Sequence, residues 1–528
     1  MSHLKRAVVI GGGHNGLVCA AYLARSGVQT TLVERRSSLG GAVGSFEYLP
    51  GYRAALTNSP GSFEGRVMTE LELERHGLRF HRPEVTVAQR FEERTFVGFR
   101  DRNRVAEQIE VFQAGEYARY RGLIDDLNDL GSVMGLSVWQ RPDSLEELRA
   151  RLRGAPQRAL FEQVFDGSLM DLLDERLRSP HAKSLLMMLA LPGTLQSPRE
   201  RGSALGLMLR PWSMASLLPG EDDTAARSPL RGSVGTPIGS MSAIIDALER
   251  SARASGVQIT TGCAVREIVK DGDGVRGVAL EDGGIIEAEA VVSTVEPSLL
   301  QSALLDDPDD LVLGYRVPTP TGSAYKLALA LDGLPDVPGL PDDVDPEQVL
   351  GSQIRIGSSP EHIEHAILAG LEGRVADEPI MWGMVPSVVS PQLAPEGRHL
   401  MSVNVWYAPH SLGAEYWRRH GETFAARCVA LLDDQLPGLA ARVAAVRGLT
   451  PFDIEEEFAL TGSNITHGEM TLEHFFDRRP HPAAADGRAA LDGLYLGGSG
   501  SWPGGYVTGV PGRNAARAVL QDLGFATR

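Results

Sequence analysis

The sequence predicts an α/β fold in which a domain built on a parallel sheet is interrupted by a second, α+β domain. Three observations carry this prediction. The chain has 528 residues, too many for one ordinary core. It opens with an apolar run that leads into a glycine turn and then a helical pattern. Its middle holds alternating apolar runs and a long helical stretch, which predict a mixed sheet with a helical cap.

The glycine turn near the N-terminus has the pattern of a Rossmann-like, dinucleotide-binding unit. Its glycines fit G-x-G-x-x-G after a short apolar strand and before a helical stripe. The first glycine permits the tight turn, the second lets backbone approach a pyrophosphate, and the third lets the helix pack on the strand. The expected contacts here are Gly11, Gly13, His14, Asn15 and Gly16.

An acid follows this turn at the spacing that the motif requires. Glu34 ends the second predicted strand and lies 18 positions after Gly16, close to the ~20 positions at which an acid meets a ribose hydroxyl. The extra phosphate of NADP would be repelled there. The same glycine spacing recurs at Gly272, Gly274 and Gly277, but that segment lies between two alternating runs and precedes no helix. We therefore predict a β-hairpin at the second match.

Composition excludes several classes of partner. The net charge of −17 argues against nucleic acid and against electrostatic attachment to acidic membranes, while other peripheral membrane contact stays open. The three cysteines lie far apart in the sequence, so we expect no local dithiol and no cysteine metal site. Their low number fits a reducing, cytoplasmic location. No apolar run approaches the ~20 residues of a spanning helix. The longest apolar stretch, 185–218, is broken by prolines and charges and is expected in the helical cap.

The residues after Glu34 extend the motif. Two arginines can neutralise phosphate charge, and a Gly-Gly pair gives backbone a second close approach to the cofactor. This pattern resembles the extended FAD motif of the amine oxidase and phytoene desaturase flavoprotein superfamily. The contacts expected from it are Arg35, Arg36, Gly40, Gly41 and Ala42.

The tail is the second strong signal. A short strand, a glycine loop and a helix beginning near Pro511 place N–H donors where a reduced flavin carries negative charge. Residues 502–509 resemble the "HPGGGVTG" segment of the phytoene-dehydrogenase-like branch of this superfamily, as do 197–204, 462–468 and 478–480. Trp502 and Tyr506 depart from that pattern. The resemblance implies further cofactor contacts at Val265, Gly498, Ser499, Gly505, Tyr506 and Val507.

The resemblance also implies a function. The chain is expected to be an FAD-dependent dehydrogenase or desaturase that moves a hydride from a C–C or C–N bond of a hydrophobic or amphipathic small molecule to flavin N5. The FAD is expected to be non-covalent, because the tail has no cysteine. Electrons would pass to oxygen, a quinone or another acceptor. The alternatives are an oxygen-using amine or amino-acid oxidase, a flavin-fold protein with a non-catalytic binding role, and a redox-silent isomerase.

Five side chains are candidates for work on the substrate. Tyr506 and Trp502 are expected to stack on it or to wall the flavin face. His467 could serve as a base near neutral pH. Asn464 lies in the same loop as His467, and Lys326, in a predicted strand, could pair with a carboxylate. No metal ligands are predicted.

The pattern along the chain predicts a discontinuous arrangement of two domains. Residues 1–80, 232–300 and 485–528 are expected to form the FAD-binding domain. Residues 81–231 and 301–484 are expected to form the substrate-binding domain with its helical cap. Within these, 47–63 is expected to be a loop that returns toward the cofactor, and 414–436 a helix pair or one long helix.

Overall fold

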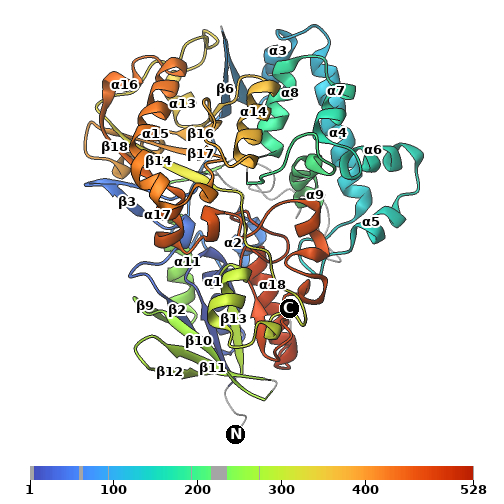
Figure 1. Ribbon diagram of the computed structural model, residues 1–528, viewed down its shortest axis with the longest axis vertical. Coiled ribbons are helices and arrows are strands. Elements are labelled where there is room, and N and C mark those ends of the chain that lie inside the picture. Colours follow the sequence, from blue (N-terminus) through green and yellow to red (C-terminus); the bar gives the residue numbers. More distant parts are fainter. Residues whose placement is uncertain are drawn as a thin grey trace.

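The computed structural model describes residues 5–58, 63–92, 94–191, 193–215, 235–272 and 274–526. Two sheets organise these residues, one near the chain termini and one at the opposite end of the molecule (Figure 1). The expected boundary between residues 231 and 232 lies outside the described residues, as do residues 216–218 of the apolar stretch and 59–62 of the expected loop.

A five-stranded parallel sheet forms the first layer, in the order β19-β13-β1-β2-β9. Apolar residues fill β1 because both faces of the sheet are covered. Helix α1 packs against α11 and α18, so the first and last helices of the chain lie together. The α/β fold expected from the glycine turn is confirmed. The elements are β1 (Arg6–Ile10), α1 (His14–Arg25), β2 (Gln29–Glu34), α11 (Ser242–Ala254), β9 (Gln258–Thr261), β13 (Ala290–Ser293), β19 (Leu494–Leu496) and α18 (Val510–Asp522).

The second glycine match is a hairpin, as predicted. Strands β10 (Val265–Asp271) and β11 (Gly274–Leu280) pair antiparallel, and β12 (Ile285–Glu287) extends them into a three-stranded sheet. Gly272 has a φ of +62°, the left-handed conformation that a tight turn requires. The G-x-G-x-x-G spacing thus occurs twice in the chain, and its second occurrence includes a turn between two strands.

A seven-stranded mixed sheet organises the other end, in the order β18-β14-β17-β16-β15-β6-β7. Its neighbours pair antiparallel except for β15 and β6, which are parallel. The expected mixed sheet is therefore present. Its strands are β6 (Val85–Phe91), β7 (Arg94–Phe99), β14 (Ala324–Leu331), β15 (Gln353–Ile356), β16 (Met381–Met384), β17 (His399–Trp406) and β18 (Val443–Leu449).

Helices beside this sheet form the expected cap (Figure 1). They are α3 (Arg102–Glu110), α4 (Glu116–Met134), α5 (Leu145–Arg151), α6 (Ala155–Phe165), α7 (Leu169–Arg176), α8 (Pro180–Ala190) and α9 (Leu209–Ala215). The apolar stretch that suggested a hydrophobic substrate lies in α8, α9 and the segment between them, which includes a 3-10 helix, Ser203–Met208. Its large side chains, such as Leu186, Met187 and Met208, are buried in the core. These side chains hold the cap together, so this stretch does not itself indicate the substrate.

The remaining elements connect the two ends. Residues 47–63 were expected to be a loop, but they include part of a small hairpin, β3 (Phe46–Leu49) with β4 (Tyr52–Ala54). Within the expected range 414–436, residues 414–435 form one long helix, α15. Strands β5 (Phe80–His81) and β8 (Thr236–Pro237) pair where the chain passes between the two ends. The helices are α2 (Gly65–Glu70), α12 (Pro297–Leu299), α13 (Pro346–Leu350), α14 (Pro360–Leu371), α15 (Ala414–Gln435), α16 (Leu439–Arg442) and α17 (Pro451–Phe458).

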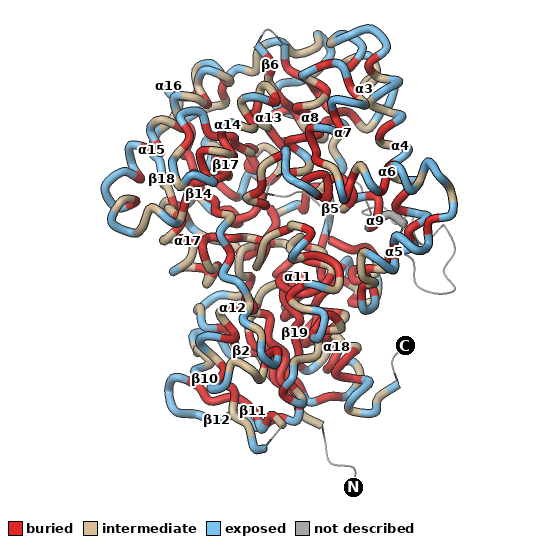
Figure 2. Tube along the Cα trace, turned by 45° about the vertical axis from the view of Figure 1, so that its right-hand side comes forward, coloured by how far each residue is buried: buried red, intermediate tan, exposed pale blue. Residues whose placement is uncertain are grey.

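Burial follows these layers. The strands and inner helix faces are buried, whereas the outer surfaces of α3, α5 and α15 are exposed (Figure 2). Among the described helices, none is both long enough and apolar enough to cross a bilayer.

Candidate functional site

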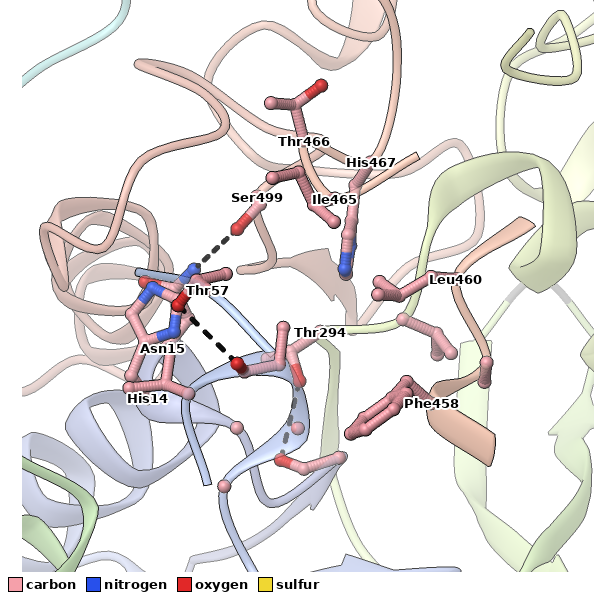
Figure 3. Close-up of a pocket in the computed structure, with 18 of the residues that line it drawn as sticks. His14, Asn15, Thr57, Thr294, Phe458, Leu460, Ile465, Thr466, His467 and Ser499 are labelled. Atoms are coloured by element: carbon pink, nitrogen blue, oxygen red, sulfur yellow. Dashed lines mark hydrogen bonds between the residues drawn. The ribbon is translucent and has the colours of Figure 1, made fainter. Parts of the chain in front are cut away.

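A cavity of about 300 Å³ lies between the two sheets. One side is formed at the carboxyl ends of β1, β2 and β13, where Ile10, Glu34 and Thr294 line it. The other side is formed by Trp382 and Trp406 of the seven-stranded sheet. Open α/β sheets bind ligands in the crevice beyond the carboxyl ends of their strands. Figure 3 shows side chains from both parts around this cavity.

Most of the predicted site residues meet in this cavity. They are Gly11, Gly13, His14, Asn15, Glu34, Arg35, Arg36, Gly40, Gly41, Ala42, Val265, His467, Ser499, Gly505, Tyr506 and Val507. Gly16 and Gly498 lie behind it. A Cβ at Gly16 would lie 2.0 Å from the Gly11 carbonyl oxygen, and one at Gly498 would lie 2.5 Å from the Thr294 carbonyl oxygen. These two glycines permit close packing of the backbone.

Glu34 fixes the shape of the glycine turn. Its carboxylate accepts hydrogen bonds from the backbone N–H of Gly12 at 2.7 Å and of Arg36 at 2.9 Å. The Gly40 N–H donates to the Gly12 carbonyl at 2.8 Å, which joins the Gly-Gly segment to the turn. A Cβ at Gly13 would meet nothing within 4 Å. The turn therefore presents open space beside backbone groups, the cradle that a pyrophosphate requires.

Both arginines after Glu34 are held by the end of α17. Arg35 donates to the carbonyl oxygens of Glu456 and Glu457. Arg36 pairs with the Glu457 carboxylate at 2.8 Å and lies 4.8 Å from the centre of the Phe458 ring. Each guanidinium lines the cavity while α17 fixes its position.

The tail closes the site from the far end of the chain. Asn15 Nδ2 donates to Ser499 Oγ at 3.3 Å, although 484 positions separate the two residues (Figure 3). Thr294 Oγ1 donates to the Ile10 carbonyl at 2.9 Å. These bonds bring the first glycine turn, the end of β13 and the tail loop to one place, as the two distant motifs predict.

Two histidines face this cavity with unpartnered nitrogens, His14 buried and His467 half-buried (Figure 3). Burial lowers the pKa of His14 to about 4 and that of His467 to about 3, the latter with help from Arg479 and His14. His14 Nε2 and His467 Nδ1 are buried without a hydrogen-bond partner. Buried polar atoms are normally bonded, so these two nitrogens, together with the open cradle at Gly13, fit a bound molecule that carries polar groups. The proposed role of His467 as a base stays a prediction.

Lys326 does not pair with a carboxylate, contrary to expectation. Its Nζ donates to the Leu56 carbonyl at 2.8 Å, to Asn58 Oδ1 at 3.0 Å and to Asn404 Oδ1 at 2.9 Å. Burial lowers the pKa of Lys326 well below its usual range, and neutral acceptors satisfy the amine. Asn58 and Asn404 line the cavity, so Lys326 is a positioning residue behind them.

Trp502 lies outside the cavity, although we expected it beside the cofactor. Its ring contacts Phe475 and Phe476, with centroids 5.3 and 6.2 Å away, and its Nε1 donates to the Ser137 carbonyl at 3.2 Å. This aromatic cluster gives the indole a packing role. Tyr506 does line the cavity, and burial raises its pKa to about 12.

Asn464 also lies outside the residues that line the cavity. Its Oδ1 accepts bonds from the N–H and hydroxyl of Thr466, and its Nδ2 donates to Glu469 at 3.2 Å. Asn464 therefore shapes the loop that carries His467.

No pattern in the sequence indicated the aromatic wall opposite the glycine turn. Trp382 and Trp406 form an edge-to-face pair with centroids 5.5 Å apart, and the Nε1 of each is buried without a partner. They come from neighbouring strands β16 and β17, where each belongs to an ordinary apolar run. Only the pairing of those strands places both rings at the cavity.

Comparisons with known proteins show the family of this chain. The model of the flavin-containing amine oxidoreductase family matches residues 16–520, and the chain belongs to that family. It is 32% identical to mouse pyridine nucleotide-disulfide oxidoreductase domain-containing protein 2, over 98% of this chain and 93% of that protein. It is 26% identical to the zeta-carotene-forming phytoene desaturase of Myxococcus xanthus, over 96% and 91%. The predicted superfamily and branch are confirmed.

A solved structure shares the fold. An oxidoreductase from Methanosarcina mazei superposes with a TM-score of 0.62 at 16% identity, covering 98% of this chain and 100% of that one. Family and fold together identify the chain as a flavoprotein oxidoreductase, the class that its motifs predicted.

Proposed function

We propose that this flavoprotein holds FAD without a covalent link and dehydrogenates a C–C or C–N bond of a hydrophobic or amphipathic small molecule. One observation carries the proposal: a single cavity joins a glycine cradle at the ends of parallel strands to an aromatic wall from the second sheet. A dinucleotide and an apolar substrate can therefore lie next to each other.

Residues of the first domain suit the adenosine and pyrophosphate of FAD. Gly13 leaves the space that the pyrophosphate needs, and Arg36 brings positive charge to that space. The Glu34 carboxylate has lone pairs beyond those that Gly12 and Arg36 use, so it can accept a ribose hydroxyl. Val265 lines the same end of the cavity.

When bound, a flavin supplies a hydride acceptor at N5. The chain itself provides a mainly apolar cavity in which a substrate can be oriented. Trp382, Trp406 and Leu460 supply apolar surface, and Asn404 supplies an amide fixed by Lys326. Among the described lining residues, Glu34 is the one carboxylate, and it lies at the end of β2 beside the glycine turn. The aromatic end of the cavity thus lacks a described acid for an ammonium group, which favours the dehydrogenase over the amine oxidase alternative.

The visible spectrum of the purified protein tests this proposal. A bound, extractable flavin that matches FAD by mass is expected, and a panel of amphipathic metabolites should include one that bleaches it without oxygen. A protein that remains colourless after addition of FAD would overturn the cofactor assignment. Bleaching by primary amines alone, with hydrogen peroxide released in air, would favour the amine oxidase alternative. The acceptors that restore colour, such as oxygen or a quinone, would identify the route by which electrons leave.

A further inference from the structure

A row of side chains crosses the seven-stranded sheet beside the cavity. Strand register places Arg355 opposite Trp382, Trp382 opposite Asn404, and Asn404 opposite Lys326. Cross-strand partners lie on the same face of a sheet. Because Trp382 and Asn404 line the cavity, Arg355 lies one strand beyond the lining residues on the same face.

Arg355 differs from the lysine at the other end of this row. Lys326 has three acceptors for its amine, whereas Arg355 uses only its Nε, which donates to Gln353 at 2.9 Å. Its guanidinium lies 5.1 Å from the centre of the Trp382 ring. Among the described residues no carboxylate pairs with it, and its side chain is half-buried. The two terminal nitrogens of the fork are therefore available to a ligand.

The cap adds a second unpaired arginine nearby. Tyr120 of α4 lies within electrostatic range of both Arg355 and Arg210 of α9, and α4 packs against α9. Burial lowers the pKa of Arg355 to about 10 and lowers that of Arg210. In each case the Tyr120 phenol acts in the opposite direction and no described carboxylate does. Arg210 is exposed on the cap, whereas Arg355 is half-buried. Cations removed from water are normally paired, so the surroundings of Arg355 lack a negative charge.

We infer that Arg355, assisted by Arg210, binds an anionic oxygen group, a carboxylate or a phosphate, at the end of the substrate remote from the flavin. The planar fork of arginine matches both groups. Together with the apolar cavity, this defines the substrate as an amphipathic anion whose apolar part extends past Trp382 toward the cofactor. The inference rests on the proposed function, since it takes this cavity as the place of the substrate.

Calorimetric titration of the FAD-loaded protein with three probes of equal chain length tests the inference. Decanoate and decyl phosphate carry the two anions, and decanol is neutral. At least one anion should bind roughly tenfold tighter than decanol or more, because charge-assisted bonds to a fork are lost in the alcohol. The tighter of the two anions identifies the group. Equal binding of all three probes to the wild type would overturn the inference.

Substitutions test whether Arg355 and Arg210 cause the preference for an anionic probe. Arg355→Met should abolish the preference for the anion and leave decanol binding within about twofold, while Arg210→Met should reduce the preference by a smaller factor. Arg447→Met is the matched control, because Arg447 is exposed on edge strand β18 of the same sheet. If Arg355→Met does not fold by circular dichroism, Arg355→Lys takes its place and should lose most of the preference, since it keeps the charge and loses the fork. A preference that survives these changes would overturn the inference. Calorimetry needs no turnover, so failure of every metabolite to bleach the bound flavin would count against the proposed function alone.

Discussion

The Glu34 carboxylate accepts the Gly12 N–H at 2.7 Å, which ties the end of β2 to the glycine turn after β1. A second bond, from the Arg36 N–H at 2.9 Å, holds the other carboxylate oxygen. Glu34 therefore shapes the turn in addition to offering lone pairs to a ribose.

Glu34→Ala should weaken FAD binding because it removes both of these roles. Hydrogen bonds to charged groups contribute about 1.5–3 kcal/mol, so we expect the dissociation constant to rise by roughly tenfold or more. Glu34→Arg should weaken it at least as much, because it also removes the acceptor of the Gly12 N–H, the Arg36 N–H and the ribose hydroxyl. The fluorescence of released FAD measures both. Glu267→Ala, at an exposed position of β10, is the control, and equal affinity in all variants would contradict the role of Glu34.

Gly13 and Gly16 should respond differently to alanine. A Cβ at Gly16 would lie 2.0 Å from the Gly11 carbonyl oxygen, whereas one at Gly13 meets nothing within 4 Å. Gly16→Ala should lower the melting temperature of the apoprotein. Gly13→Ala should leave it nearly unchanged and still reduce FAD affinity, because the methyl group fills the cradle. Equal melting temperatures of the two variants would show that the helix does not pack here as described.

His467 should make the fold sensitive to acid. Burial lowers its pKa from about 6.5 to about 3, so the unfolded chain binds a proton that the folded chain does not. The contribution of this group to stability is present above pH 6.5 and is lost as pH falls from there toward 3. His467→Asn, a residue that tolerates the φ of +56° at this position, should reduce the loss of stability between pH 7 and pH 4.5 in urea unfolding.

The matched control for this measurement is His365→Asn, at an exposed position of α14. It should leave the pH dependence of unfolding unchanged. If the His467 and His365 variants respond to acid as the wild type does, His14 and other groups account for the acid sensitivity.

Lys326 should be important for stability. Lys326→Met leaves the oxygens of Leu56 and Asn404 without their donor, while Asn58 Oδ1 keeps the Ser402 hydroxyl at 2.8 Å. We expect the free energy of unfolding to fall by about 3 kcal/mol, since each buried group left unbonded costs about 1–3 kcal/mol. Lys183→Met, which breaks an ion pair with Asp174 on the cap, should cost less than about 1 kcal/mol. Urea unfolding compares the two, and equal losses would refute the special role of Lys326.

Tyr506 should restrict which substrates enter. Its ring lines the cavity, and Tyr506→Gly restores the residue of the related branch while enlarging the space. We expect bulkier molecules to bleach the flavin in the variant than in the wild type, in an anaerobic panel. If substrate range and turnover both stay the same, Tyr506 has no part in selectivity.

Sequence alone predicted the parts of the site whose chemistry depends on local spacing. The turn at Gly11 to Gly16, the acid at Glu34 and the tail loop near Ser499 each follow from a short pattern, because a glycine turn between a strand and a helix needs only neighbouring residues to form. The hairpin at Gly272 was predicted in the same way. These patterns were sufficient to predict the α/β fold and the flavin.

Tertiary structure decided the rest of the site, because the position of those residues depends on which strands pair and in what register. Arg355, Trp382, Asn404 and Lys326 come from four strands and form one row only through that register. Trp502 belongs to a cofactor motif in the sequence, yet its ring lies in an aromatic cluster outside the cavity. A local pattern specifies backbone shape within a few residues, whereas the direction of a side chain and its distant neighbours are set by packing of the whole chain. The glycine turn was therefore determined by the sequence pattern, and the aromatic wall opposite it by the fold.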